Sequence, residues 1–174
     1  MKTKNSIVKL TVSAVFAAMV FVMTCFLMIP LGSLGYVHLG DAALLLSGAV
    51  LPFPFAFFAV FGSVLADIVS GYAIWAPITL VVKLCMLIPF AVLKNKEIKI
   101  IGGGTVVAAL IAAAVNVAGY YLGESILFGS FVSPLSAVFP NTLQSLSGLV
   151  VFSLVGVLAD RGHIVHKLMR KLKA

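Results

Sequence analysis

The sequence predicts an all-α integral membrane protein, a bundle of six transmembrane helices with cytoplasmic N- and C-termini and short second and third helices. Its composition is the first reason: of 174 residues, 62% are hydrophobic and 10% are charged, with a mean hydropathy of +1.21. Average soluble domains are about 45–50% apolar and about 25% charged. Long apolar segments and the basic residues beside them are the other reasons. A soluble enzyme, a nucleic-acid-binding protein and a disordered chain are therefore excluded.

Four apolar segments are long enough to cross a bilayer as helices, because about 30 Å of hydrocarbon requires about 20 residues. They span residues 7–29, 73–93, 103–122 and roughly 141–158. The first ends at Pro30 and a glycine-rich stretch. No linker or low-complexity segment separates the segments, so we expect a single domain over residues 1–174.

The apolar stretch 39–69 is divided by Pro52 and Pro54, and it is either one long kinked helix or a hairpin of two short helices. A segment of 13 residues such as 39–51 spans about 20 Å as a helix. Such short helices thin the bilayer or are sheltered by longer neighbours.

The basic residues decide between these alternatives. All but one of the 12 Lys and Arg residues flank apolar segments: Lys2, Lys4, Lys9, Lys94, Lys96, Lys99, Arg161, Lys167, Arg170, Lys171 and Lys173. Basic residues beside apolar spans mark the cytoplasmic side. A hairpin gives six spans, which puts both termini and residues 94–99 in the cytoplasm and leaves the outer loops without Lys or Arg.

Polar residues within the apolar segments gather in the outer half of this topology, where ionisable groups face a cavity or a partner. The candidate site residues are Asp41, Asp67, Tyr72, Trp75, Thr79, Lys83, Asn116, Tyr120, Asn141, Gln144 and Ser145, with Glu124 at the rim. The inner half has almost no polar side chains. This asymmetry favours a polar pocket that is open outward, because a channel needs polar residues along its whole length.

Each candidate also has a structural interpretation. Asp41 begins a helix, where a carboxylate can cap free N–H groups, and Asp67 can pair with Lys83. Tyr72 and Trp75 suit an interfacial aromatic belt. Asn116 and Gln144 can join helices by hydrogen bonds. The remaining polar groups are then incidental: Glu124 solvated at the rim, His38 at the end of a loop, and His163 and His166 in the basic tail.

No catalytic, metal-binding or cofactor-binding pattern is present. Cys25 and Cys85 lie in apolar segments and are expected to fill the core. The chain lacks H-E-x-x-H and G-x-S-x-G, and the glycines at 102–104 lack the Lys-Ser/Thr of a phosphate-binding loop. We expect no enzyme, no metal and no cofactor, and any ATP-driven transport requires another subunit.

Small residues on the first helix predict a contact with a partner helix. Ala14 and Ala18 lie one turn apart on one face, a spacing that lets helices approach closely in lipid. Similar pairs on the fifth helix are expected to pack within the bundle.

Several segments together resemble a known family. They are the Ala-xxx-Ala first helix, Tyr-Val-His-Leu-Gly-Asp at 36–41, the proline-broken hairpin, Leu-Ala-Asp-Ile-Val-Ser-Gly-Tyr at 65–72 and Ala-Pro-Ile-Thr-Leu-Val-Val-Lys at 76–83. The whole chain resembles the S components of energy-coupling factor (ECF) vitamin transporters, in the branch around riboflavin, hydroxymethylpyrimidine and pyridoxine.

The resemblance implies a subunit that captures a water-soluble vitamin in an outward pocket and topples in the membrane to deliver it. Its partners would be a membrane-embedded T component, met by Ala14 and Ala18, and two cytoplasmic ATPases. We expect a prokaryotic plasma membrane, a pyridoxine-type or hydroxymethylpyrimidine ligand, and no nucleic acid.

Particular site roles follow for such a ligand. Tyr72, Trp75 or Tyr120 would cover its ring, while Asn116, Asn141 and Gln144 would bond its polar atoms. Lys83 and Asp67 would supply charge, and residues 32–36 with 123–140 would form a lid.

Two alternative functions belong to other classes of membrane protein. A self-sufficient channel or secondary carrier predicts transport by this chain alone. An intramembrane enzyme or an assembly factor requires a nucleophile–base pair or a metal cluster.

Overall fold

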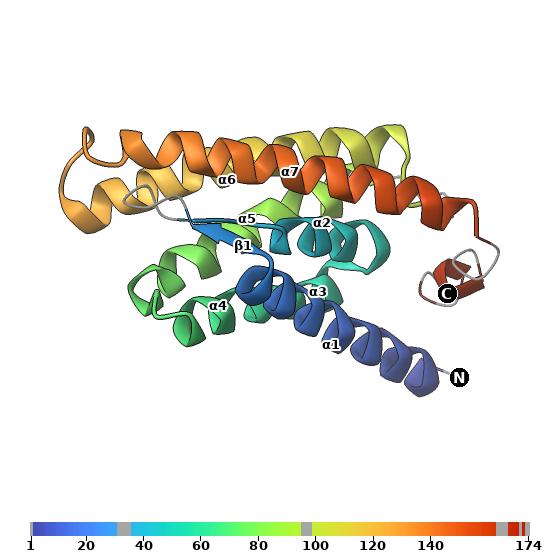
Figure 1. Ribbon diagram of the computed structural model, residues 1–174. Helices are drawn as coiled ribbons and strands as arrows, with labels where there is room; N and C mark the ends of the chain where they lie inside the picture. Colours follow the sequence, from blue (N-terminus) through green and yellow to red (C-terminus); the bar gives the residue numbers. More distant parts are fainter. Residues whose placement is uncertain (1, 31–35, 95–98, 163–166, 171, 173–174) are drawn as a thin grey trace.

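The computed structural model describes residues 2–30, 36–94, 99–162, 167–170 and 172, and most of them are helical. The helices form one elongated bundle (Figure 1). In chain order they are α1 (Lys2–Phe26), α2 (Gly40–Val50), α3 (Phe53–Ala56), α4 (Phe58–Val69), the 3-10 helix η2 (Ala73–Trp75), α5 (Ala76–Leu93), α6 (Gly103–Phe128) and α7 (Leu135–Asp160).

A small antiparallel ribbon, which the sequence did not predict, accompanies the helices. Strand β1 (Met28–Pro30) pairs with β2 (Tyr36–His38), with Ile29 opposite Val37. Strands of three residues are too short to show an alternating pattern in the sequence. Residues 28 and 29, predicted as the end of the first helix, therefore belong to a strand.

The apolar segments divide as the sequence predicts. Four helices are long and apolar enough to cross a membrane, and two shorter apolar helices span Gly40–Val50 and Phe53–Val69. The break falls at the prolines: α2 ends at Val50, Pro52 precedes α3, and Pro54 lies in its first turn. A proline at this position lacks only a hydrogen bond that the first turn of a helix does not make.

The two C-terminal helices begin or end beyond their predicted bounds. Helix α6 continues past residue 122 to Phe128, and Gly129 then ends it in the left-handed conformation at φ 63°. Glycine adopts this conformation without steric penalty, which makes it a common helix stop. Helix α7 begins at Leu135, so Asn141 lies in its second turn and does not open the helix.

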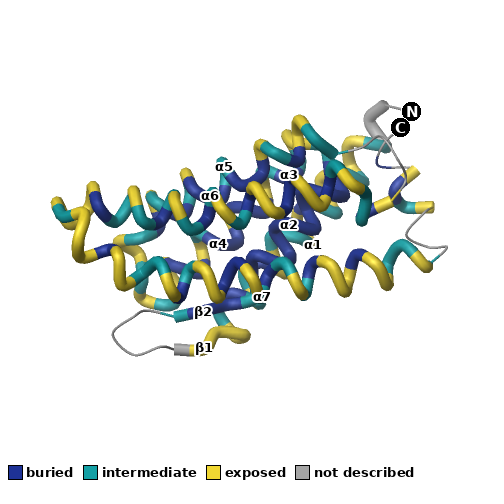
Figure 2. Tube along the Cα trace, turned by 90° about the horizontal axis from the view of Figure 1, so that it is seen from above, coloured by how far each residue is buried: buried dark blue, intermediate teal, exposed yellow. Residues whose placement is uncertain are grey.

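Helix α2 occupies the centre of the bundle, and all of its residues are buried. It contacts α1, α4, α5 and α7, and Figure 2 shows it enclosed by helices whose outer faces are exposed. A helix sheltered in this way does not need to match the bilayer thickness. This explains how an 11-residue apolar helix fits among longer ones.

Side-chain contacts tie several helix termini together at one end of the bundle. The Lys94 ammonium donates to the carbonyl oxygens of Gly48 (3.0 Å) and Leu51. The Asp160 carboxylate accepts the backbone N–H groups of Ile100 (2.7 Å) and Ile101 (2.9 Å). Helix α1 begins and α7 ends at this same end, whereas the ribbon and η2 lie toward the other (Figure 1).

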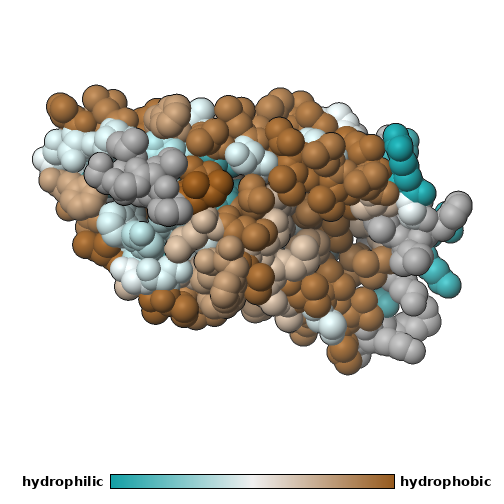
Figure 3. Space-filling view, in the orientation of Figure 1, coloured by the Kyte–Doolittle hydropathy of each residue, from teal (hydrophilic) through white to brown (hydrophobic). Residues whose placement is uncertain are grey.

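The sides of the bundle are apolar. Large hydrophobic residues such as Val92, Leu122 and Leu154 are exposed on the long helices. Figure 3 shows a hydrophobic band across the middle of one face, with more hydrophilic residues toward both ends. An apolar surface of this extent suits a lipid environment.

Candidate functional site

A cavity of about 400 Å³ lies at the ribbon end of the bundle. It is framed by β2, the ends of α4 and α6, and the starts of α5 and α7. Its lining residues are Tyr36, His38, Asp67, Tyr72, Trp75, Thr79, Tyr120, Glu124, Phe128, Ser133, Ser136, Ala137, Pro140, Asn141 and Gln144.

Aromatic rings form a continuous wall along one part of the cavity. The ring centres of Tyr36 and Tyr72 are 4.6 Å apart, those of Tyr72 and Trp75 are 5.8 Å apart, and those of Trp75 and Phe128 are 6.4 Å apart. His38 extends the series, 5.6 Å from Tyr36. Such a wall offers a planar ligand both stacking and edge contacts.

Asp67 is the buried acid of the lining. Its Oδ1 accepts a hydrogen bond from the Tyr36 hydroxyl at 3.0 Å. Its Oδ2 is buried and has no hydrogen-bond partner of ordinary geometry among the described residues. The Thr79 hydroxyl also interacts with this carboxylate, and it makes a 2.8 Å hydrogen bond with the Tyr120 hydroxyl.

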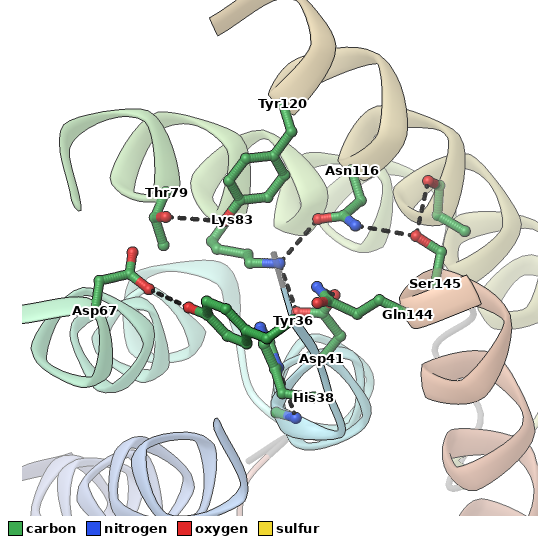
Figure 4. A network of polar contacts seen from close by, with 12 residues as sticks. Tyr36, His38, Asp41, Asp67, Thr79, Lys83, Asn116, Tyr120, Gln144 and Ser145 are labelled. Atoms are coloured by element: carbon green, nitrogen blue, oxygen red, sulfur yellow. Dashed lines mark hydrogen bonds and ion pairs between the residues drawn. The ribbon is translucent and has the colours of Figure 1, made fainter. Parts of the chain in front are cut away.

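A layer of hydrogen-bonded polar side chains lies beneath the cavity, with the Asp41–Lys83 ion pair at its centre (Figure 4). Lys83 Nζ lies 2.6 Å from Asp41 Oδ1 and 2.8 Å from Asn116 Oδ1. Gln144 donates to Asp41 Oδ2 at 2.8 Å, and Asn116 donates to Ser145 at 3.0 Å. The layer therefore joins α2, α5, α6 and α7.

Burial makes this pairing necessary. Lys83 is 0% exposed and Asp41 is 1% exposed, and a buried charge is stable only when it is paired and hydrogen-bonded. The Tyr120 ring covers the ammonium, with Nζ 5.2 Å from the ring centre. Gly148 lets α7 approach, since a Cβ there would lie 3.2 Å from the Asp41 Cβ.

Two of the alternative structural interpretations drawn from the sequence are wrong. Lys83 pairs with Asp41 and not with Asp67, because α2 lies at the centre of the bundle beside α5. Asp41 lies in the first turn of α2, but no side chain caps that helix. Its two carboxylate oxygens bind Lys83 and Gln144 instead.

The strand residues of the cavity are held in defined protonation states. His38 Nδ1 accepts the backbone N–H of Gly40 at 3.1 Å, which leaves the proton of the neutral ring on Nε2. Burial lowers the pKa of His38 to about 4, with Lys83 adding to the effect and Asp41 opposing it. Burial and the neighbouring Asp67 raise the pKa of Tyr36, so its hydroxyl remains a donor.

The cavity brings together seven of the predicted site residues: Asp67, Tyr72, Trp75, Thr79, Tyr120, Asn141 and Gln144. The other four, Asp41, Lys83, Asn116 and Ser145, belong to the buried layer and do not line the cavity. They support the site, and Gln144 is the link because it lines the cavity and donates to Asp41.

Sequence reasoning missed several lining residues. Tyr36 and His38 were visible within the 36–41 motif, but no periodicity indicated that this segment folds over the cavity. Glu124 was expected to be solvated at the rim, whereas it is partly buried in the lining. Phe128 and the lining residues at 133–140 were not identified because the predicted fifth helix ended too early and the predicted sixth began too late.

The predicted lid is corrected in part. Its first section, residues 32–35, lies outside the described residues, and Tyr36 is in β2. Most of its second section, residues 123–140, is helical in α6 and α7. Only the turn between these helices is irregular.

The predicted partner-contact residues lie on the outside of α1. Ala14 and Ala18 are exposed. The backbone at Ala17, between them, packs closely against α4, since a Cβ on Gly62 of α4 would lie 2.2 Å from the Ala17 carbonyl oxygen.

An apolar helical bundle with a cavity lined by aromatic and polar side chains is typical of a membrane protein that binds a small molecule. The chain belongs to the ECF-type riboflavin transporter S component family, which it matches over residues 4–160. Comparison with curated proteins gives no match. Membership makes the chain the vitamin-binding, non-enzymatic subunit of an ECF transporter and a multi-pass membrane protein.

Proposed function

We propose that this S component captures a single-ring vitamin or vitamin precursor, of the pyridoxine or hydroxymethylpyrimidine type, in the cavity at the ribbon end of the bundle. The main support for this proposal is the cavity itself, whose wall combines aromatic rings with hydrogen-bonding side chains. Its volume of about 400 Å³ is near the lower end of the ~300–1,000 Å³ typical of small-molecule sites. A single-ring vitamin fits within this volume.

The ligand's ring is recognised by Tyr36, Tyr72 and Trp75, which present closely spaced aromatic surfaces. Its polar substituents bond to Asn141 and Gln144 on α7 and to Asp67 on α4. Gln144 is held in position by its 2.8 Å hydrogen bond to Asp41, whose charge Lys83 balances. The buried layer thus acts as a rigid floor for the site.

The protein crosses the plasma membrane of a prokaryotic cell six times, with both termini in the cytoplasm and the cavity open outward. Six apolar segments support this topology, four long and two short. Lys94 follows α5 and Arg161 follows α7, and α7 ends away from the ribbon (Figure 1), which agrees with the positive-inside rule. An outward cavity gives the vitamin access from outside the cell.

Delivery depends on partners: a T component and two cytoplasmic ATPases. The exposed small residues Ala14 and Ala18 on α1 form the contact with the T component, and the smooth apolar sides of the bundle allow it to topple within the membrane. The alternative of a self-sufficient channel or carrier is disfavoured by the paired, buried layer that closes the cavity floor. Reconstitution of this chain alone into liposomes should therefore give no vitamin uptake.

Mass spectrometry of the purified protein tests the proposed ligand. The protein is isolated in detergent, denatured, and the released small molecules are identified; candidates are then added back in a thermal unfolding assay. We expect a single-ring vitamin or precursor that raises the unfolding temperature. Recovery of riboflavin would overturn the single-ring assignment, and the absence of any stabilising vitamin would overturn vitamin binding.

A further inference from the structure

We propose that Asp67 is the specificity-determining residue of the cavity and selects ligands that carry a positively charged or N–H donor group. The inference rests on the proposed function and deepens it by defining the chemical class of the ligand. The favoured class is a heteroaromatic ring with an amino substituent or a protonated ring nitrogen. Phosphorylated forms of the same rings are excluded.

The free oxygen of Asp67 is the first argument. The residue is 4% exposed and lines the cavity, and its Oδ1 accepts the Tyr36 hydroxyl. Its Oδ2 makes no hydrogen bond of ordinary geometry with the described residues, and the Thr79 hydroxyl also interacts with the carboxylate. A buried carboxylate oxygen without a donor is costly. A ligand that donates a hydrogen bond to Oδ2 removes this cost, whereas a ligand that only accepts leaves it in place.

The charge of the cavity is the second argument. Asp67 and Glu124 are among the described lining residues, and no Lys or Arg is. The nearby Lys83 is already paired with Asp41 at 2.6 Å and hydrogen-bonded to Asn116. His38 accepts a backbone hydrogen bond through Nδ1 and is neutral. The described lining residues therefore offer two carboxyl groups and no cationic side chain, which favours a ligand that brings a positive charge or an N–H donor and disfavours a phosphate.

The geometry around Asp67 is the third argument. The Tyr36 ring, whose hydroxyl binds the carboxylate, lies 4.6 Å from the Tyr72 ring. A ligand ring placed against these two aromatic side chains can direct an in-plane amino group toward Oδ2. Figure 4 shows Asp67 directed toward the same space as Tyr36 and Thr79.

Two matched pairs of probes test the inference by calorimetry at pH 7.5. The first pair is pyridoxamine and pyridoxine; the second is 4-amino-5-hydroxymethyl-2-methylpyrimidine and its analogue without the amino group. We expect the amino member of each pair to bind the wild-type protein at least about tenfold more tightly, the effect of one charge-assisted hydrogen bond. Pyridoxine 5′-phosphate should bind at least about tenfold more weakly than pyridoxine, as charge repulsion predicts.

Three variants test whether the Asp67 carboxylate causes the preference for the amino member of each pair. Asp67→Asn should reduce it to about twofold or less, since the amide presents its own donor. Tyr36→Phe should retain it, because the Asp67 carboxylate is intact. Asp160→Asn, the same substitution at the other end of the bundle, should also retain it.

The contradicting results are distinct. If the wild-type protein binds both members of each pair equally, or if Asp67→Asn keeps the preference, the inference is overturned and the proposed function stands. If the folded wild-type protein binds none of the probes, both fail. If Asp67→Asn does not fold, the comparison of the paired probes on the wild-type protein still tests the inference.

Discussion

Lys83 is the residue on which the buried polar layer depends most. Its ammonium balances Asp41, bonds to Asn116 and lies under the Tyr120 ring, and it is 0% exposed. No periodicity in the sequence distinguishes such a lysine from one that contacts a ligand. The packing of α2 against α5 makes the difference, because it brings Asp41 to the ammonium.

Substitution of Lys83 by methionine should destabilise the protein strongly. It leaves the Asp41 carboxylate buried without a cation, which typically costs about 3–5 kcal/mol of unfolding free energy. Unfolding by SDS in mixed micelles measures this loss. The double variant Lys83→Met with Asp41→Asn is the control and should recover part of the stability. Equal stability of the single and double variants would show that the charge balance is unimportant.

The buried His38 should make stability depend on pH. Its pKa is about 4 in the folded protein and about 6.5 when unfolded, with Asp41 and Lys83 as its charged neighbours. As the pH falls from 6.5 to 4, His38 becomes protonated in the unfolded chain but stays neutral in the folded protein. Its contribution to the free energy of unfolding is therefore fully present above pH 6.5 and is lost across this window. At about 1.4 kcal/mol per pKa unit, the loss approaches about 3 kcal/mol.

Thermal unfolding at pH 7 and pH 4.5 checks this expectation. His38→Asn retains an acceptor for the Gly40 N–H and does not titrate, so its unfolding temperature should fall less over the same interval. An identical pH dependence in both proteins would assign the effect to other groups.

At the scale of elements, the contact between α1 and α4 requires a residue without a side chain. A Cβ on Gly62 would lie 2.2 Å from the Ala17 carbonyl oxygen. Gly62→Ala should therefore destabilise the protein by about 1–3 kcal/mol through overpacking. Gly103→Ala is the matched control, because a Cβ there meets nothing within 4 Å. Thermal unfolding compares the two; similar melting temperatures would contradict close packing of α1 on α4.

The exposed face of α1 should carry the contact with the T component. Ala14→Leu with Ala18→Leu adds bulk there without entering the core, so thermal stability and vitamin binding should be retained while co-purification of the partner subunits is lost. Ala114→Leu with Ala118→Leu is the matched control, since these residues have the same spacing and are exposed on α6. Loss of the partners in the α6 variant alone would move the interface to that helix.

The sequence locates most helices correctly, but it does not predict which helices pack against one another. Length, hydropathy and Pro52 locate the long segments and the break after α2. The end of α6 and the start of α7 were misplaced because residues 123–140 were interpreted as part of a lid, although Gly129 is a recognisable helix stop.

The candidate site, too, could be predicted only in part from the sequence. Polar residues in apolar helices were expected to converge, and seven of them line one cavity. Their pairing was not predictable, because it depends on which helices pack side by side. The contribution of β2 was missed since nothing in three residues indicates that they fold over the helices.

At the scale of the whole molecule, the two ends of the bundle have different roles. One end is tied together by Lys94 and Asp160 through backbone groups of neighbouring helix termini. The other end is hollow, with an aromatic wall and a hydrogen-bonded floor. A closed end with basic residues and an open end with a ligand-sized cavity suit a subunit that captures a molecule on one side of a membrane.

Fluorescence titration of Trp75 tests the central claim most directly. It is the only tryptophan of the chain and it lines the cavity, so its emission reports on this site alone. The account predicts that a single-ring vitamin or precursor changes the emission saturably at a one-to-one ratio, and that Gln144→Ala weakens this binding while the protein remains folded. An emission that no vitamin changes, in a protein that unfolds cooperatively, would contradict it.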